Sequence, residues 1–249
     1  MELTKNAKEY AEKLFNEEDK SLLETDPEFM ERILNFSLDE VKNHGNLDNT
    51  SRWLAILATL IGCQGIDLFK VMVKASLKDG LTPEQVKEVI YQATAYLGAG
   101  RTYGFLLATN SIFKEEGIVL PLAPQATTTL ENRLQKGNQA QVDIFGEGMK
   151  GSYEKGGETQ RINYWLADNC FGDYYTRGTL DLRQRELITF CFIASQGGCE
   201  PQLIAHAKGN MNMGNTKEML IEVVSQCVPY IGYPRSLNAI RCIQEAASK

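Results

Sequence analysis

DGLTPEQVKEVIYQATAYLGAGR, residues 79–101, is the stretch that decides the fold class of this chain. It opens on Thr82, Pro83 and Gln85, which suit a helix N-cap, the first helical position and the far end of a capping box. The apolar residues that follow keep the spacing of one buried helix face: Val86, Val89, Ile90 and Ala93. The segment predicts an amphipathic helix. Because no window of strand length alternates with a period of two, we expect an all-α fold.

A second stretch, MGNTKEMLIEVVSQCVPYIGYPR at 213–235, repeats this pattern 134 residues later. The residues of the first stretch that recur in the second are Gly80, Thr82, Glu84, Glu88, Val89, Gln92, Tyr96, Gly98 and Arg101. Upstream, LDNTSRWLAILATL (47–60) matches LDLRQRELITFCFI (180–193) at an offset of 133. Gly80 and Gly214 each stand where a preceding helix should end in a left-handed C-cap. So many identities in one register indicate a tandem duplication.

The duplication sets the domain organisation that we expect. The first copy covers residues 1–120 and the second covers residues 130–249. Between them, 121–129 form a linker that contains two prolines and a threonine run. Two helical repeats in one chain predict a pseudo-dimer of repeats.

Composition narrows the class of protein further. The hydrophobic content of 43% and charged content of 23% are ordinary for a globular protein, and the net charge of -6 argues against nucleic acid as a partner. The most apolar run, Trp53 to Cys63, is far shorter than the ~20 residues of a membrane span. The N-terminal MELTKNAKEYAEKLF lacks the apolar core of a secretory signal. We therefore expect a cytoplasmic protein with no membrane partner.

The cysteines predict free thiols. No CxxC pair occurs among Cys63, Cys170, Cys191, Cys199, Cys227 and Cys242, which is typical of unpaired cysteines in a reducing compartment. Two histidines and scattered cysteines supply no recognisable ligand set, so we expect no bound metal.

Residues 185–206, RELITFCFIASQGGCEPQLIAH, hold the candidate functional residues. We expect two antiparallel helices, 182–195 and 200–213, joined by a tight turn at 196–198. Cys199 would then begin the second helix, where unpaired backbone N–H groups favour a thiolate and would lower its pKa.

Three polar residues share one face of that second helix: Cys199, Gln202 and His206. Cys199 and His206 lie about 10 Å apart along the axis, too far for a direct hydrogen bond. Glu186, on the first helix, differs in height from His206 by only about 5 Å. A Glu–His pair is suited to moving protons near neutral pH. The pattern alone leaves open a satisfied surface histidine and a solvated helix face at Arg185–Glu186.

The second copy resembles the carboxymuconolactone decarboxylase family, which also contains the alkylhydroperoxidase D type of antioxidant protein. The matching pieces are GDYYTRGTLDLRQRELI (172–188), QLIAHAKGNMNMGNTKEMLIEVV (202–224) and PYIGYPRSLNAI (229–240). The first copy is similar more loosely. The resemblance implies two alkylhydroperoxidase D-like helical repeats and subunits packed in rings, so that three tandem chains would form a homo-oligomeric trimer.

The peroxidase branch of that family carries C-x-x-C-x-x-x-H, with a relay Glu on the preceding helix. Here Cys199 falls on the first cysteine position, His206 on the His, and Glu186 near the relay Glu. Gln202 stands at the second cysteine position, so the resolving thiol is missing. What remains possible is a one-cysteine thiol peroxidase, with peroxiredoxin-like activity on a peroxide and an outside reductant.

The decarboxylase branch implies a lyase that needs no metal or organic cofactor and acts on a small carboxylated lactone or similar oxo-acid. His206 and Glu186 would do the proton transfer. Arg177 is the candidate for holding the substrate carboxylate, because a guanidinium can bind it in two places, and Gln202 is a second substrate-binding candidate. A surface salt bridge is the alternative role for Arg177.

The first copy lacks these residues. Trp53 stands at the Glu186 position, Met72 at the His206 position and Gly65 at the Cys199 position, while His44 aligns with Arg177. We expect one site per chain, in the second copy. The lyase is favoured over the peroxidase because of Gln202. A non-enzymatic ring-forming or ligand-binding protein is the third possibility.

Overall fold

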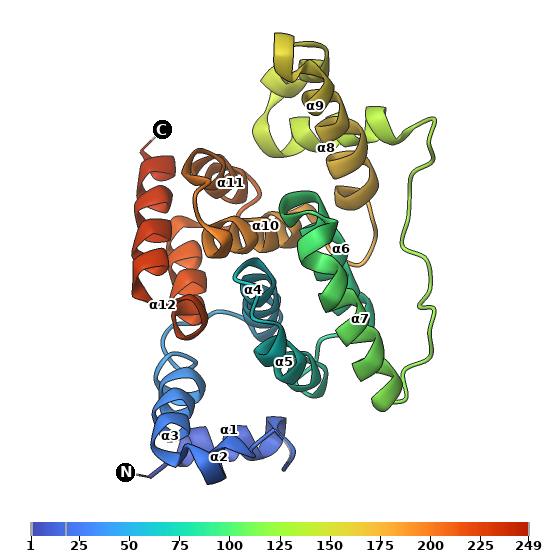
Figure 1. Ribbon diagram of the computed structural model, residues 1–249. Helices are drawn as coiled ribbons and strands as arrows, with labels where there is room; N and C mark the ends of the chain where they lie inside the picture. The colour runs from blue at the N-terminus through green and yellow to red at the C-terminus, as the bar shows by residue number, and fades with distance from the viewer. Residues whose placement is uncertain (1, 18, 249) are drawn as a thin grey trace.

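The computed structural model describes residues 2–17 and 19–248, and throughout this part of the chain the regular structure is helical (Figure 1). The helices of the first copy are α1 (Lys5–Leu14), α2 (Leu22–Thr25), α3 (Pro27–Asn35), the π-helical turn η1 (Phe36–Glu40), α4 (Asn49–Gly62), α5 (Ile66–Lys78), α6 (Pro83–Leu97) and α7 (Ala99–Glu115). Those of the second copy are α8 (Arg133–Phe145), α9 (Gln160–Trp165), the π-helical η5 (Leu166–Tyr175), α10 (Leu182–Gln196), α11 (Glu200–Asn212) and α12 (Lys217–Ala247). Three 3-10 turns lie between α8 and α9: Glu147–Met149, Ser152–Glu154 and Gly157–Thr159. The expected all-α fold is confirmed.

The predicted helix signals act as the sequence implies. Thr82 and Gln85 close the capping box at the start of α6. Gly80 and Gly214, after α5 and α11, have φ of 112° and 88°, the left-handed region that glycine enters without strain. The repeat is also visible in the backbone. α6 and α7 are separated at Gly98, and the long α12 contains a non-helical Gly232 at the equivalent position.

The centre of the molecule is the packing of α4 against α10, the equivalent helices of the two copies (Figure 1). Most of α4 and most of α10 are buried. The backbones approach closely where α4 ends, because a Cβ at Gly62 would lie 1.9 Å from the Ser195 hydroxyl oxygen. One apolar core runs from Ala7 to Ala246 and includes both copies, so the repeats form a pseudo-dimer with a shared interior.

The copies also exchange hydrogen bonds. The Gln92 side chain, on α6, donates to the Arg185 carbonyl at 2.9 Å and to the Thr189 hydroxyl at 2.8 Å, both on α10. Gln226, the equivalent residue on α12, donates to the Val41 carbonyl at 2.6 Å. As a result, α6 of the first copy lies against the helix hairpin of the second.

Two further features concern chemistry rather than shape. All six cysteines are free thiols, as expected. Within the described part of the chain, no helix combines the length and the apolar character needed to cross a membrane, and no cluster of three His, Cys, Asp or Glu side chains is arranged to hold a metal.

Candidate active site

The predicted hairpin is confirmed. α10 begins at a capping box between Asp181 and Gln184 and ends at Gly197. Gly197 and Gly198 have φ of 72° and 75°, which lets the chain reverse in two residues before α11. A side chain at Gly197 would also require the exposed Arg235 side chain of α12 to move, since its Cβ would lie 2.1 Å from a guanidinium nitrogen.

The hairpin brings Glu186 and His206 into direct contact. His206 Nδ1 and Glu186 Oε2 are 2.9 Å apart, and the side chains are 11% and 0% exposed. The other carboxylate oxygen, Glu186 Oε1, accepts a hydrogen bond from the Tyr175 hydroxyl at 2.8 Å. With its Nδ1 committed to Glu186, the imidazole has Nε2 left for a substrate, because no described residue bonds to that atom.

A short hydrogen-bond network supports the carboxylate. The Tyr175 hydroxyl lies 2.8 Å from the Thr189 hydroxyl and 2.7 Å from the Tyr96 hydroxyl. Because Tyr175 gives its proton to Glu186, it accepts from both of these neighbours. Burial is the largest cause that raises the pKa of Tyr175 and of Tyr96 well above the usual value, and the nearby charge of Glu186 raises both further. Both phenols therefore remain protonated: Tyr175 donates to the carboxylate of Glu186, and Tyr96 donates to Tyr175.

The imidazole is held between two aromatic rings. Tyr96, from α6, and Phe145, from α8, each meet His206 edge-on, with ring centroids 5.4 and 5.5 Å away. α8 reaches this position because it packs tightly on η5, where a Cβ at Gly137 would lie 2.0 Å from the Ala167 carbonyl oxygen. The rings limit the directions from which a substrate can approach His206.

Space for the pair depends on Gly209, one turn after His206 on α11. A Cβ there would lie 2.5 Å from Glu186 Oε2 and 2.8 Å from the Phe145 ring. The equivalent residue of the first copy is Ala75, where no such pair has to fit.

The other predicted residues lie outside this contact. Cys199 is half-buried at the start of α11, and its sulfur is 3.7 Å from the Gln196 amide nitrogen. Gln202 is exposed. Another thiol, Cys170, lies beside Tyr96 and within the electrostatic influence of Glu186, and burial raises its pKa to about 12.

Arg177 has a different neighbour from the one we expected. Its Nε is 2.9 and 3.0 Å from the two carboxylate oxygens of Glu88, on α6 of the first copy. Glu88 also accepts from the fully buried Arg185 at 3.1 Å. Arg177 thus takes part in an ion pair, its alternative role, and lines a cavity separate from the Glu186–His206 contact.

The sequence reasoning missed several residues that shape the site: Tyr175, Thr189, Tyr96, Gln92 and Gly209. Two of them carried a signal, because Gln92 and Tyr96 recur at the equivalent positions of the second copy. That recurrence indicated a shared structural role but gave no indication that the first copy reaches into the site of the second.

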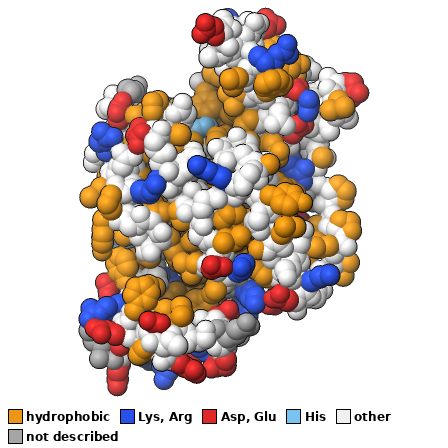
Figure 2. Space-filling view, in the orientation of Figure 1, with side chains coloured by type: hydrophobic (Ala, Val, Ile, Leu, Met, Phe, Trp, Pro, Cys, Tyr) orange, Lys and Arg blue, Asp and Glu red, His pale blue; other side chains and the backbone are white. Residues whose placement is uncertain are grey.

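The first copy has no equivalent acid–base pair. Trp53 donates from its indole nitrogen to Asp79 at 2.8 Å. Met72 and Tyr230, the counterparts of His206 and Tyr96, line an apolar cavity of about 340 Å³ next to α3. Hydrophobic side chains gather around the hollow that separates the α1–α3 unit from the rest of the molecule (Figure 2).

Fold and site together define a class: an all-α protein of two tandem repeats, with one buried Glu–His pair in the second repeat. The sequence profile of the carboxymuconolactone decarboxylase family matches residues 27–110 and 162–245. The chain belongs to this family.

Two relatives agree with that assignment. A 4-carboxymuconolactone decarboxylase of Acinetobacter baylyi is 26% identical over 117 residues, which is 46% of this chain and 87% of that protein. A crystal structure from Burkholderia xenovorans, described as a candidate gamma-carboxymuconolactone decarboxylase subunit, aligns with a TM-score of 0.53 at 21% identity. It covers 97% of both chains and shows the same fold over the whole tandem arrangement.

Proposed function

We propose that the protein is a cofactor-free acid–base enzyme that acts on a small carboxylated lactone or similar oxo-acid. The observation that carries the proposal is the 2.9 Å contact between His206 and Glu186. The name of the Acinetobacter relative, a decarboxylase of a carboxylated muconolactone, supports the substrate class.

In this proposal, Glu186 accepts the Nδ1 proton of His206, so that Nε2 carries the lone pair and acts as the base. When Nε2 takes a proton from the substrate, the imidazolium is stabilised by the adjacent carboxylate. Tyr175 holds that carboxylate in place through Oε1. The same histidine can then return the proton to the carbon or oxygen that needs it.

A one-cysteine peroxidase fits the geometry less well. Its reactive residue would be Cys199, whose sulfur has the Gln196 amide as its hydrogen-bond partner. No hydrogen bond between described residues joins that sulfur to His206 or Glu186, so the proton relay lacks a route to it. Cys170 lies beside Tyr96, but burial raises its pKa to about 12 and keeps it as a thiol, which is a poor nucleophile.

The two alternatives predict opposite results in a variant series. With a carboxylated muconolactone as substrate, His206→Ala should lower kcat/KM by about 10²–10⁴, and Glu186→Gln should also lower it strongly. Cys199→Ser, the matched control, should keep most of the activity. If Cys199→Ser instead abolished peroxide reduction by a chain that is inactive on lactones, the acid–base proposal would be wrong.

We also propose that three tandem chains assemble into a ring. The surface supports this idea because several large apolar side chains are exposed on the helices, and covering them in an assembly would remove apolar area from water. The most exposed aromatic and leucine residues on the helices are Phe29, Tyr103, Leu107, Trp165, Tyr233 and Leu237.

A further inference from the structure

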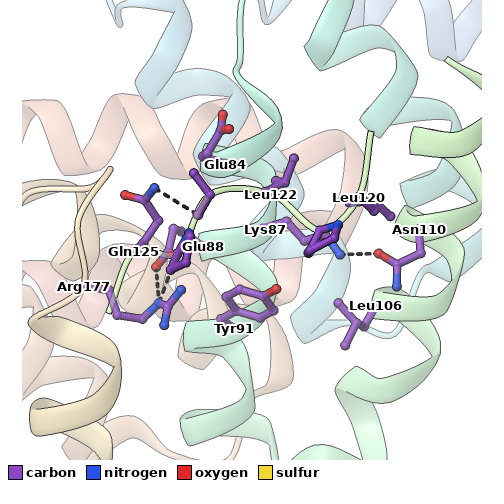
Figure 3. Close-up of a pocket in the computed structure, with 13 residues that line it drawn as sticks. Glu84, Lys87, Glu88, Tyr91, Leu106, Asn110, Leu120, Leu122, Gln125 and Arg177 are labelled. Carbon is purple, nitrogen blue, oxygen red and sulfur yellow. Dashed lines mark hydrogen bonds and ion pairs between the residues drawn. The ribbon is translucent and has the colours of Figure 1, made fainter. Parts of the chain in front are cut away.

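A second cavity, of about 410 Å³, lies outside the Glu186–His206 site (Figure 3). Its walls come from α6, from α7, from Leu120 and from linker residues 121–125, and Arg177 lies at one end. The linker is tied down beside Arg177, because the Gly178 N–H donates to the Gln125 carbonyl at 2.9 Å. Nothing in the proposed acid–base chemistry uses this cavity.

Lys87 is a buried cation in the wall of this cavity. Its residue is 5% exposed, and its ammonium donates to the Asn110 side-chain oxygen. The rings of Phe113 and Tyr91 lie 5.6 and 6.0 Å from the ammonium. No carboxylate of a described residue comes within ion-pair distance of it, and burial lowers the pKa of Lys87.

The acidic residues nearby do not neutralise Lys87. Glu88 is already shared between Arg177 and Arg185. Figure 3 shows the Glu84 carboxylate directed away from the Lys87 ammonium. A buried charge without a counter-ion is unfavourable, so the cavity has a place for an anionic group.

Arg177 provides a second set of donors for that group. Glu88 occupies only its Nε, and no hydrogen bond to a described residue uses its two terminal amino groups. The guanidinium lies 5.1 Å from the centre of the Tyr91 ring, which keeps it in a fixed position at the cavity wall.

The rest of the wall is apolar and comes largely from Leu106, Leu120 and the linker residues Pro121, Leu122 and Pro124. We propose that this cavity binds a small organic monocarboxylate, with its carboxylate between Lys87 and Arg177 and its apolar body against the linker. Lys87 and the two guanidinium groups that share the single carboxylate of Glu88 leave an excess of positive charge here, which favours an anionic ligand, and a cavity of this size suits a small one. The proposal does not depend on the chemistry at His206.

The test uses the full chain and benzoate as the probe, with benzamide as the uncharged isostere, in calorimetric titrations at fixed ionic strength. Benzoate should bind the wild type, and benzamide should bind at least tenfold more weakly. Lys87→Met and Arg177→Gln should each weaken benzoate binding at least tenfold. Lys70→Met, which changes an exposed lysine paired with Asp67, is the matched control and should bind like the wild type.

Two further measurements keep the result decisive. His206→Ala should bind benzoate as the wild type does. Loss of binding in that variant, with binding retained in Lys87→Met, would place the carboxylate at the acid–base site and overturn the proposal. Benzoate should raise the melting temperature of the wild type but not of Arg177→Gln, which keeps Lys87 in place. If the wild type did not bind benzoate at millimolar concentration, the proposed monocarboxylate site would also be wrong.

Discussion

At the scale of single residues, Gly209 is as important for the Glu–His contact as the two side chains that make it. We predict that Gly209→Ala displaces Glu186 from His206, because the added Cβ would lie 2.5 Å from Glu186 Oε2. The expected cost is about 1–3 kcal/mol in the free energy of unfolding, as for overpacked cores. Urea unfolding would measure this cost, and histidine NMR would report the loss of the Nδ1 hydrogen bond.

The matched control is Gly100→Ala on α7, where a Cβ would meet no atom within 4 Å. That change should leave the histidine signals unchanged and should stabilise the chain slightly, if at all. If Gly209→Ala and Gly100→Ala had the same free energy of unfolding and the same histidine signals, the close approach at Gly209 would not be needed for the Glu186–His206 contact.

A second prediction at the scale of single residues concerns Asp79 and the pH dependence of the free energy of unfolding. Burial opposes ionisation, but hydrogen bonds from Lys13, Tyr10, Trp53 and Asn49 outweigh it and lower the pKa of Asp79 to about 2. Because this pKa is depressed in the folded state, the stabilisation is complete above the unfolded pKa, about 3.9, and is lost as the pH falls toward 2.

Asp79→Asn should therefore lower the free energy of unfolding by about 2 kcal/mol at pH 7, and by about half as much at pH 3. Urea titrations at the two pH values measure this difference. Asp67→Asn, at a carboxylate 93% exposed, should change stability by less than about 0.5 kcal/mol at both. An Asp79→Asn effect that did not depend on pH would contradict the ionic explanation.

At the scale of elements, the repeat is clearest where helices break. Gly98 and Gly232 have φ of 80° and 73° with extended ψ of 153° and 172°, a backbone region that only glycine enters readily. Their identity in the two sequences therefore has a conformational cause. In both copies a second helix follows the break: α7 after Gly98, and the part of α12 that follows Gly232 and contains Pro234.

Gly232→Ala should destabilise the chain by about 1–3 kcal/mol because of backbone strain alone, since the nearest atom to a new Cβ is 4.0 Å away. Gly148→Ala, also in open space but without a positive φ, is the control and should be nearly neutral. Thermal unfolding of both variants would measure the two changes in stability. A neutral Gly232→Ala would mean that the break relaxes without strain.

At the scale of the whole molecule, a chain of polar contacts joins the two copies. It runs from Arg177 through Glu88 and Arg185 to Gln92, and from there through Thr189 and Tyr175 to Glu186. The carboxylate that orients His206 is thus supported by residues of both repeats. This arrangement explains why one repeat can lose its own pair and still be needed for the site of the other.

If the proposed ring of three chains forms, the mass of the protein in solution should be that of a trimer. Light scattering on the purified chain should give about three times the 27.9 kDa of one chain, because apolar side chains such as Phe29 and Leu237 would be covered in the assembly. A dilution series would show whether the species is stable. A mass of one chain at all concentrations would contradict the trimer.

The sequence by itself determined the features that depend on neighbours along the chain. The capping residues and apolar spacing around Thr82 predicted α6. The length of the turn at 196–198 predicted that Glu186 and His206 would lie at similar heights on the hairpin, and the structure brings them into contact across 20 positions. These predictions succeeded because caps, turns and helical rise are local properties.

Only the tertiary structure decided what surrounds that pair. Tyr96 meets Tyr175 across 79 positions, and Arg177 meets Glu88 across 89, because α6 of the first copy packs on the hairpin of the second. The direction in which two helices cross depends on the packing of whole surfaces, which no local pattern encodes. For the same reason, the sequence left two roles open for Arg177, and its contact with Glu88 became visible only in the tertiary structure.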